Sequence, residues 1–405
     1  MVYTPPVTLS CLTSSVNSRN GGYSLGESMT PRHSIPSLDG LRACSVLFVI
    51  AAHSLEWIRN TPTVFPYLQL GTLALLGVDT FFVISGFLIT YILLKELDST
   101  GGIRLRKFYF RRFFRIFPPF YVYLAVVGIL AAAGIVHMNH WALLVSGLYI
   151  WNYLVLPNSW LVGHTWSLSL EEQFYLLWPP LLAKLGRKRS LYAALTVILL
   201  SPLSRMITYA VYPPWRFFEW AMLHTRLDTI MFGCVLALLW NNKQFQRVIE
   251  KLLRPELFAC SLLFLTVIGP LFETGVRPRY QWIVGYPLHG VLISFILVYV
   301  VKKPASLPGR FLNLGVMKHI GIISYSLYLW QEMFDGPHVA FFPWNLIAIF
   351  ACAELSYFLV ERPALSLRDR LEGKWKFLSA PTAGESRAVS QQNTTSDAAV
   401  LVPDK

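Results

Sequence analysis

Long apolar runs recur along almost the whole chain, and short polar segments separate them. A helix needs about 20 apolar residues to cross the hydrocarbon core of a bilayer. Ten runs approach that length, at about 41–58, 70–94, 117–136, 166–183, 190–212, 224–240, 256–272, 282–301, 316–334 and 339–360. The pattern therefore predicts an all-α, polytopic membrane protein with about ten transmembrane helices.

An eleventh apolar run, WALLVSGLYIWNYL at 141–154, is shorter and rich in aromatic residues. Lysine and arginine accumulate on the cytoplasmic side of a membrane protein. If 141–154 crossed the bilayer, the basic cluster GRKRS at 186–190 would move to the outside. We therefore expect a short re-entrant or interfacial helix here. With the N-terminus inside, most of the 35 lysines and arginines then fall in inner segments, and both termini are cytoplasmic.

Composition agrees with this class of protein. Of 405 residues, 54% are hydrophobic and only 14% charged, whereas soluble domains carry about a quarter charged residues. The net charge of +13 is spread over short loops and forms no basic face, so we expect no nucleic-acid partner. The five cysteines lack metal-ligand spacing, which predicts neither a disulfide framework nor a metal site.

The two ends of the chain differ from the apolar part. Residues 1–34 are rich in small polar residues and lack the apolar segment of a signal peptide. We expect a disordered cytoplasmic N-terminus at 1–34, a transmembrane domain at 35–365, and a cytoplasmic, mostly disordered tail at 366–405.

The first apolar run contains two ionisable residues, Arg42 and His53, in SLDGLRACSVLFVIAAH. They are eleven residues apart, which is about 16 Å along a helix and nearly the same side of it. Ionisable side chains are costly in hydrocarbon and often functional. The alternative is that Arg42 is an ordinary anchor at the inner surface and His53 a hydrogen-bonded packing residue.

Asp79 lies within the second run, in GVDTFFVISGFLIT. An unpaired carboxylate would be costly there, so Asp79 needs a partner, for which His53 and Arg226 are candidates. Arg226 and Asp228 stand together at the head of a later run, in HTRLDTIMFGC.

A cluster of arginines interleaved with aromatic residues occupies RLRKFYFRRFFRIFPPFYVYL at 104–124. Arg111, Arg112 and Arg115 belong to it. The cluster could bind anionic lipid, or it could bind the phosphates of a cytosolic ligand, since guanidinium groups suit phosphate. We expect Pro118 and Pro119 to open the next span.

Further polar residues lie in two later runs. Glu171 and Glu172 are adjacent in GHTWSLSLEEQFYLLWPPLL, and about 100° separates them on a helix, so one could face the bundle. Tyr325 and Tyr328 lie in ISYSLYLWQE. The sequence has no glycine-rich phosphate loop and no GxSxG element, so His53 is the natural general base.

These segments, together with FRRFFRIFPPFYVYL, RLDTIMFGCVLA and LSYFLVERP, occur in an order that resembles acyltransferase family 3, the membrane O-acetyltransferases of bacterial surface glycans. The resemblance covers about residues 35–365. It implies ten transmembrane helices in a bacterial inner membrane, an acyl-CoA donor that is usually acetyl-CoA, and a hydroxyl acceptor on a glycan or glycoconjugate. It implies no permanently bound cofactor and leaves a homo-oligomer possible.

The same resemblance assigns roles to residues. Arg42 and His53 match an Arg-x10-His motif of the family. A second family motif, rich in arginine, is matched by Arg111, Arg112 and Arg115. A third, SLSLEEQFY, contains Glu171 and Glu172, of which one is the matching residue. We expect His53 to take a proton from the acceptor hydroxyl, with Asp79, Glu171 or Glu172 orienting the imidazole. The arginines would hold the CoA phosphates. The expected acceptor contacts are Arg226, Asp228, Tyr325 and Tyr328. An acyl-histidine intermediate is equally allowed.

Two departures and two alternatives remain. Many relatives have His where this chain has Gln331, and the chain ends soon after its last run, so we expect no fused esterase-like domain. A proton-coupled transporter of a polar or lipid-linked solute could use His53 and Glu171 as a relay. A scaffold without catalysis would leave the buried polar residues unexplained.

Overall fold

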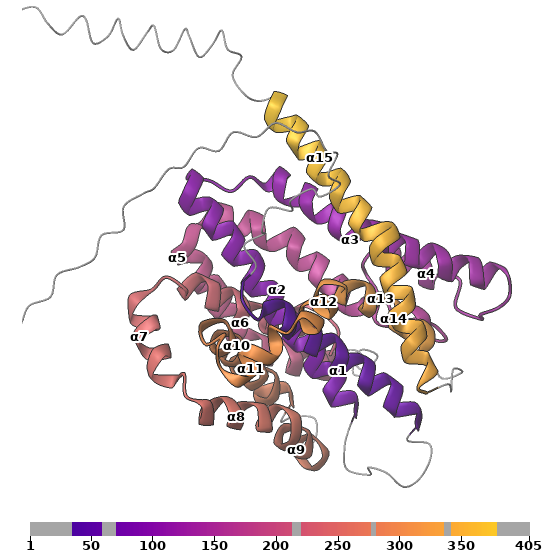
Figure 1. Ribbon diagram of the computed structural model, residues 1–405. Helices are drawn as coiled ribbons and strands as arrows, with labels where there is room; N and C mark the ends of the chain where they lie inside the picture. Colours follow the sequence, from indigo (N-terminus) through magenta and orange to yellow (C-terminus); the bar gives the residue numbers. More distant parts are fainter. Residues whose placement is uncertain (1–34, 59–69, 213–219, 277–280, 336–341, 379–405) are drawn as a thin grey trace, which may run out of the picture. The chain divides into compact units, whose positions relative to one another are not determined.

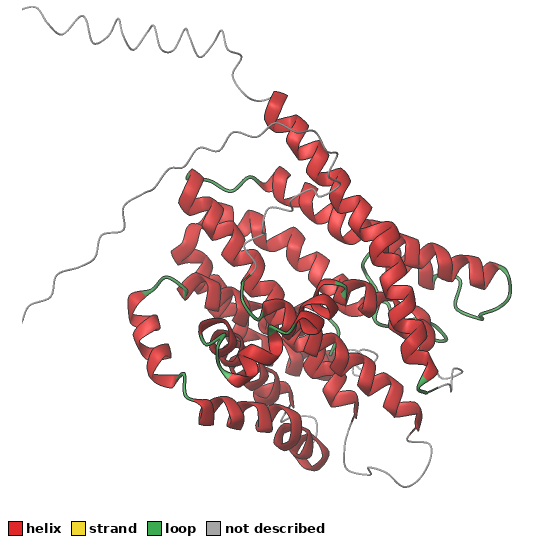
Figure 2. Cartoon of the chain, viewed as in Figure 1, coloured by secondary structure: helices red, strands yellow, loops and turns green. Residues whose placement is uncertain are grey.

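The computed structural model describes residues 35–58, 70–212, 220–276, 281–335 and 342–378. The expected disordered N-terminus, and the tail from residue 379 onward, lie outside these ranges. Every regular element in the described residues is a helix (Figures 1 and 2). The all-α prediction is therefore confirmed for this part of the chain.

Six helical segments are long and apolar enough to cross a membrane, and a seventh is added if α6 (Leu223–Leu239) and α7 (Lys243–Leu252), bent by 114°, form one span. The six are Thr72–Thr100, Leu105–Ala132, Trp160–Val211, Pro255–Phe272, Ile283–Lys302 and Trp344–Lys374. The predicted count of ten is not confirmed within the described residues.

Part of this difference lies in α5 (Thr165–Val211), whose 47 residues would extend roughly 70 Å as one straight helix. A bilayer core is only about 30 Å thick. Gly186 breaks α5, with φ 68° and ψ 178°, between the predicted runs 166–183 and 190–212. The element therefore contains two helices. The run predicted at 316–334 is likewise divided, into α12 (Gly315–Ile322) and α13 (Ser324–Phe334).

The remaining elements follow the apolar runs. The longer helices are α1 (Leu38–Ile58), α2 (Leu70–Thr100), α3 (Leu105–Ala132), α8 (Pro255–Leu263), α9 (Gly269–Val276), α10 (Tyr286–Lys302), α14 (Trp344–Ser356) and α15 (Arg362–Leu378). The short ones are α4 (Ala142–Gly147), α11 (Leu307–Leu312), a 3-10 turn η1 (Trp160–Val162), and π-helical turns η3 (Phe264–Ile268), η4 (Gln281–Gly285) and η5 (Tyr357–Glu361).

Three boundaries bear on the predictions. The helix at 142–147 has six residues, too few to cross a bilayer, as expected for 141–154. Helix α3 begins at Leu105, so Pro118 and Pro119 lie inside it and do not open it, contrary to the prediction. Neighbouring helices can satisfy the backbone groups that prolines leave free in a membrane helix. Helix α15 continues to Leu378, so the start of the predicted 366–405 tail is helical.

Helix α2 packs against both α1 and α6 (Figure 1). At two glycines the backbones of α2 and α6 touch directly. A Cβ atom built on Gly86 would lie 2.0 Å from the Ile230 carbonyl oxygen, and one on Gly233 would lie 2.0 Å from that of Val83. Small residues allow this close approach, which brings the polar side chains of α2 and α6 together in the interior.

Candidate active site

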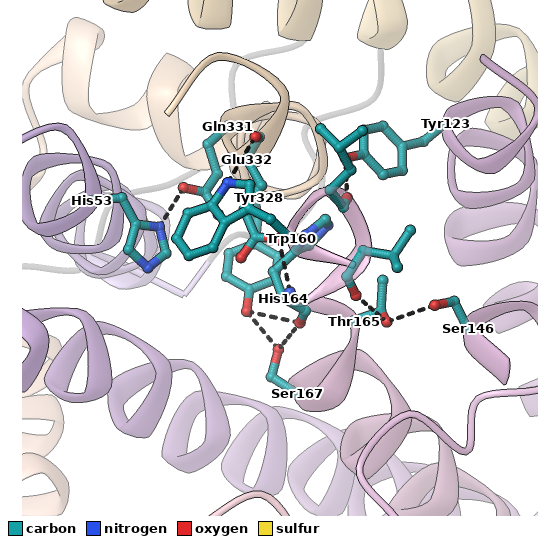
Figure 3. Close-up of polar contacts among 12 residues, drawn as sticks. His53, Tyr123, Ser146, Trp160, His164, Thr165, Ser167, Tyr328, Gln331 and Glu332 are labelled. Carbon is teal, nitrogen blue, oxygen red and sulfur yellow. Dashed lines mark hydrogen bonds and ion pairs between the residues drawn. The ribbon is translucent and has the colours of Figure 1, made fainter. Parts of the chain in front are cut away.

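His53 lies near the end of α1, where α13 and the η1 turn meet it (Figure 3). Its Nδ1 atom is 2.7 Å from Oε1 of Gln331, and its ring meets Trp160 edge-on, with 5.6 Å between centroids. An amide oxygen only accepts hydrogen bonds, so this contact places the ring proton on Nδ1. The other nitrogen, Nε2, then keeps a lone pair that can accept a proton.

The group that orients His53 is therefore an amide rather than the expected carboxylate. Gln331 occupies the position at Nδ1, while Asp79 lies with Arg226, and Glu171 accepts a hydrogen bond from Ser85 at 2.7 Å. The sequence analysis treated Gln331 only as a departure from relatives. It missed Trp160, because a tryptophan in a membrane protein is usually a packing or interfacial residue.

A second histidine pair lies beside the first (Figure 3). Nδ1 of His164 is 2.8 Å from Oε2 of Glu332, which also accepts the His164 backbone N–H at 3.0 Å. Trp160 links the two pairs, because its Nε1 donates to the Glu332 carbonyl oxygen at 3.1 Å. Tyr328 is part of the same group, with its hydroxyl 2.6 Å from Ser167 Oγ.

Next to His53, Ser54 begins a third set of contacts. Ser54 Oγ donates to Oδ1 of Asp335 at 2.7 Å, and the same oxygen accepts from Asn345 Nδ2 at 2.6 Å. Asp335 follows the last turn of α13, and Asn345 lies in the first turn of α14. Burial raises the pKa of the Asp335 carboxyl, and the Ser54 and Asn345 hydrogen bonds oppose that change.

The arginine cluster lies toward the other end of α1. Arg42 interacts electrostatically with Arg115 and Glu361, and Arg115 is 3.6 Å from Glu361. The Arg112 guanidinium lies over the Tyr175 ring at 4.9 Å and interacts with Glu172. These residues form a group of balanced charge, since Glu171 lies within range of Arg112 as well.

Arg111 and Arg112 are adjacent in sequence but have different surroundings. Arg111 is exposed and makes a two-pronged ion pair with Glu372 of α15, at 2.5 and 2.6 Å. Arg112 has no salt bridge to any carboxylate in the described parts of the chain. Arg112 is therefore the member of the predicted arginine motif that is more available to a phosphate.

Asp79 forms part of a separate buried cluster of charges. It pairs with Arg226, and its Oδ2 lies 3.3 Å from Nδ1 of His289. Arg205 pairs with Asp228 at 3.0 Å. All four charged side chains are fully buried. The expected pairing of Asp79 with Arg226 is confirmed.

The structure thus divides the predicted site residues into three groups. The first group surrounds the two histidines, His53 and His164, and contains His53 and Tyr328 of the predicted residues. Arg42, Arg112, Arg115, Glu171, Glu172 and Tyr325 lie in the second, where the Tyr325 hydroxyl donates to the Ile116 carbonyl at 3.0 Å and interacts with Glu172. Asp79, Arg226 and Asp228 lie in the third, and Arg111 lies on the surface. No set of three or more potential ligands among the described residues could hold a metal ion.

A bundle of apolar helices that encloses histidine and arginine clusters is typical of an integral membrane protein. The family model described as an acyltransferase domain matches residues 35–357. The chain therefore belongs to acyltransferase family 3, as the order of its motifs predicted.

Two relatives illustrate the match. A Staphylococcus aureus (strain COL) protein named "Putative O-acetyltransferase SACOL0978" is 33% identical over 362 residues, covering 81% of this chain and 57% of that protein. "O-acetyltransferase OatA" of Staphylococcus aureus (strain NCTC 8325 / PS 47) is 31% identical over 324 residues, covering 75% of this chain and 50% of that protein. The chain spans about half the length of the curated relatives it matches. No solved structure matches it.

Proposed function

We propose that this protein is a membrane O-acyltransferase that transfers an acetyl group from acetyl-CoA to a hydroxyl of a glycan or glycoconjugate. The observation that carries the proposal is the contact between His53 and Gln331, which leaves Nε2 of the imidazole able to accept a proton. Family membership and the names of the relatives support the choice of acyl transfer.

The donor site that we propose is the arginine group formed by Arg42, Arg112 and Arg115. Guanidinium groups bind phosphate through paired hydrogen bonds, and CoA carries several phosphates. Arg112 is the central ligand, because its guanidinium lies over aromatic rings and has no salt bridge in the described residues. Arg111 would contribute less, since Glu372 already occupies its guanidinium.

In the proposed reaction, the arginine group near the start of α1 holds the donor, and His53 near the end of α1 acts on the acceptor. Nε2 of His53 accepts the proton of the acceptor hydroxyl while the hydroxyl oxygen attacks the thioester carbonyl carbon. The carbon–sulfur bond then breaks, and the imidazolium of His53 donates that proton to the CoA sulfur. The products are an ester and free CoA. Gln331 holds the imidazole in the required tautomer. A route through an acyl-histidine would use the same nitrogen.

The membrane placement is also part of the proposal. Family membership favours a bacterial inner membrane, and the distribution of lysine and arginine favours both termini in the cytoplasm. The arginine group, at the inner end of α1, would then face cytosolic acetyl-CoA, and His53 would lie toward the outer half of the bilayer.

Calorimetry on the purified protein in detergent tests the donor site. We expect CoA and acetyl-CoA to bind the wild type, and Arg112→Ala to weaken binding by roughly 10-fold or more, the usual range for a charge-assisted hydrogen bond. Arg189→Ala is the matched control, because Arg189 is an exposed arginine on α5 outside the cluster. It should bind like the wild type.

The opposite outcomes are equally informative. Equal losses in Arg112→Ala and Arg189→Ala would mean that binding depends only on overall positive charge. No binding of either ligand to the wild type would remove the donor assignment and favour the proton-coupled transporter, for which the polar face of α5 at Ser167, Glu171 and Tyr175 offers a relay.

A further inference from the structure

Four polar atoms around His53 are buried, and each has no hydrogen-bond partner in the residues that the structure describes. They are Nε2 of Gln331, Oδ2 of Asp335, Oδ1 of Asn345 and Nε2 of His164. The four residues are 0, 1, 5 and 2% exposed, respectively. Buried polar atoms in folded proteins are bonded in about 90% of cases or more, so such a group calls for an explanation.

These atoms belong to one contiguous set of contacts. Gln331 and Asp335 are four residues apart at the end of α13, which puts them on one face of the helix. Asp335 is bonded to both Ser54 and Asn345, and Gln331 is bonded to His53. His164 joins the set through Glu332, whose carbonyl oxygen binds Trp160 beside the His53 ring.

Single polar atoms without a partner also occur elsewhere in the described bundle, for example Asp228 Oδ1 and Thr229 Oγ1, but a buried asparagine outside the His53 region is fully paired. Asn152 and Gln173 satisfy each other, with Nδ2 of Asn152 3.0 Å from Oε1 of Gln173, and Nε2 of Gln173 2.9 Å from Oδ1 of Asn152. The unpaired nitrogens of Arg226 also have a local explanation, because that guanidinium lies 3.8 Å from the centre of the Tyr286 ring. The atoms around His53 have no such compensation.

The chemistry of the four atoms is mixed. Gln331 Nε2 can only donate, Asp335 Oδ2 in its ionised form and Asn345 Oδ1 can only accept, and His164 Nε2 can do either. A hydroxyl group both donates and accepts, so a ligand with several hydroxyls on a ring could satisfy all four. Trp160 adds an aromatic surface beside them.

We infer that Gln331, Asp335, Asn345 and His164 form the acceptor subsite, which binds the hydroxyl groups of a sugar ring and holds one further hydroxyl at His53. The inference rests on the proposed function and makes it more specific. It assigns sugar recognition to the end of α13 and the start of α14, whereas the sequence analysis assigned the acceptor contacts to Arg226, Asp228, Tyr325 and Tyr328.

The test compares two kinds of alcohol as acetyl acceptors. The probes are the methyl glycosides of glucose, galactose, mannose and N-acetylglucosamine, and cyclohexylmethanol, which has a similar ring but one hydroxyl. CoA release with acetyl-CoA gives kcat/KM for each. A site that hydrogen-bonds substrate hydroxyls discriminates strongly against an analogue that lacks them. We expect the wild type to prefer at least one glycoside over cyclohexylmethanol.

Two variants then locate that preference. In Asn345→Ala and in Asp335→Asn, the ratio of the two kcat/KM values should fall by roughly 10-fold or more. Asn152→Ala is the matched control, since it also removes a buried asparagine side chain but lies outside the subsite, and its ratio should equal that of the wild type. If one subsite variant fails to fold, the other still gives the result.

Three outcomes would overturn the inference. The wild type could show no preference for any glycoside, both subsite variants could retain the preference, or Asn152→Ala could lose it to the same extent. In each case acetyl-CoA would still support CoA release, so the proposed function would survive. If no alcohol promotes CoA release and acetyl-CoA does not bind, the proposed function itself fails.

Discussion

The His53 region and the Asp79–Arg226 cluster are both buried and polar, yet they differ in how their groups are compensated. In the cluster, each carboxylate faces a guanidinium, with Asp79 on Arg226 and Asp228 on Arg205. Around His53 the groups are mostly held by single neutral contacts, and several polar atoms have no partner in the described residues. Pairing of opposite charges is what a structural cluster needs, whereas buried amide and carboxylate atoms without an opposite charge can serve a bound ligand.

This difference shows that burial alone does not distinguish a structural ionisable residue from a functional one. An ionisable residue in an apolar run indicates either a fixed internal contact or a functional group. The partner decides between the two interpretations. Asp79 and His53 look alike in sequence, but Asp79 is bonded into a network, whereas Nε2 of His53 has no hydrogen-bond partner among the described residues.

The largest expected effect comes from removing the proton acceptor. His53→Ala should lower acyl transfer by roughly 10²- to 10⁴-fold, the usual contribution of a general base, while thermal unfolding changes little. Turnover and unfolding are measured on the same purified sample. His319→Ala provides the control, because His319 is a half-exposed histidine that pairs with Glu354 and makes no hydrogen bond to the His53 group in the described residues. Near-normal turnover in His53→Ala would end the assignment.

The second effect tests the other region. Arg226→Leu should lower the free energy of unfolding by about 3–5 kcal/mol, because it leaves Asp79 buried without its partner. The double variant Asp79→Leu with Arg226→Leu should recover much of the loss. Both are followed by thermal unfolding in detergent. A single variant that stays fully stable but loses turnover would place Arg226 in the reaction instead.

The smallest effect sharpens the role of the amide. Gln331→Leu should reduce kcat by about 3- to 10-fold, in line with one lost hydrogen bond, and leave the KM for acetyl-CoA unchanged. Gln331→Glu keeps an acceptor oxygen at the same place and should restore kcat, while the loss of the Nε2 donor should raise the KM for a glycoside acceptor. Equal defects in both variants would show that the amide acts through packing and does not position His53.

Much of the fold follows from the apolar pattern. The helical class and the short helix at 142–147 could both be predicted, because they depend on local apolar runs. The start of α3 could not, since prolines usually mark a helix entrance and here lie within the helix. The number of crossings also depends on breaks such as Gly186, which a hydropathy pattern places only roughly.

The sequence predicted several residues of the candidate site but few of the contacts between them. The Asp79–Arg226 pair was one of two expected possibilities, and the structure selects it. Gln331, Asp335 and Asn345 were not predicted as part of the site, because amides and a carboxylate at helix ends look like ordinary caps or loop residues. Their proximity to His53 is a tertiary contact between α1, α13 and α14.

Helix α1 carries Arg42 of the arginine group near one end and His53 near the other, so under the proposed function its length sets how far the donor must reach. The eleven residues between Arg42 and His53 correspond to about 16 Å. An acyl carrier held by its charged part at Arg42 must deliver its reactive carbon on a slender arm of that length. Under that proposal α1 selects carriers by reach as well as by charge, and we expect a compact acyl phosphate to fall short.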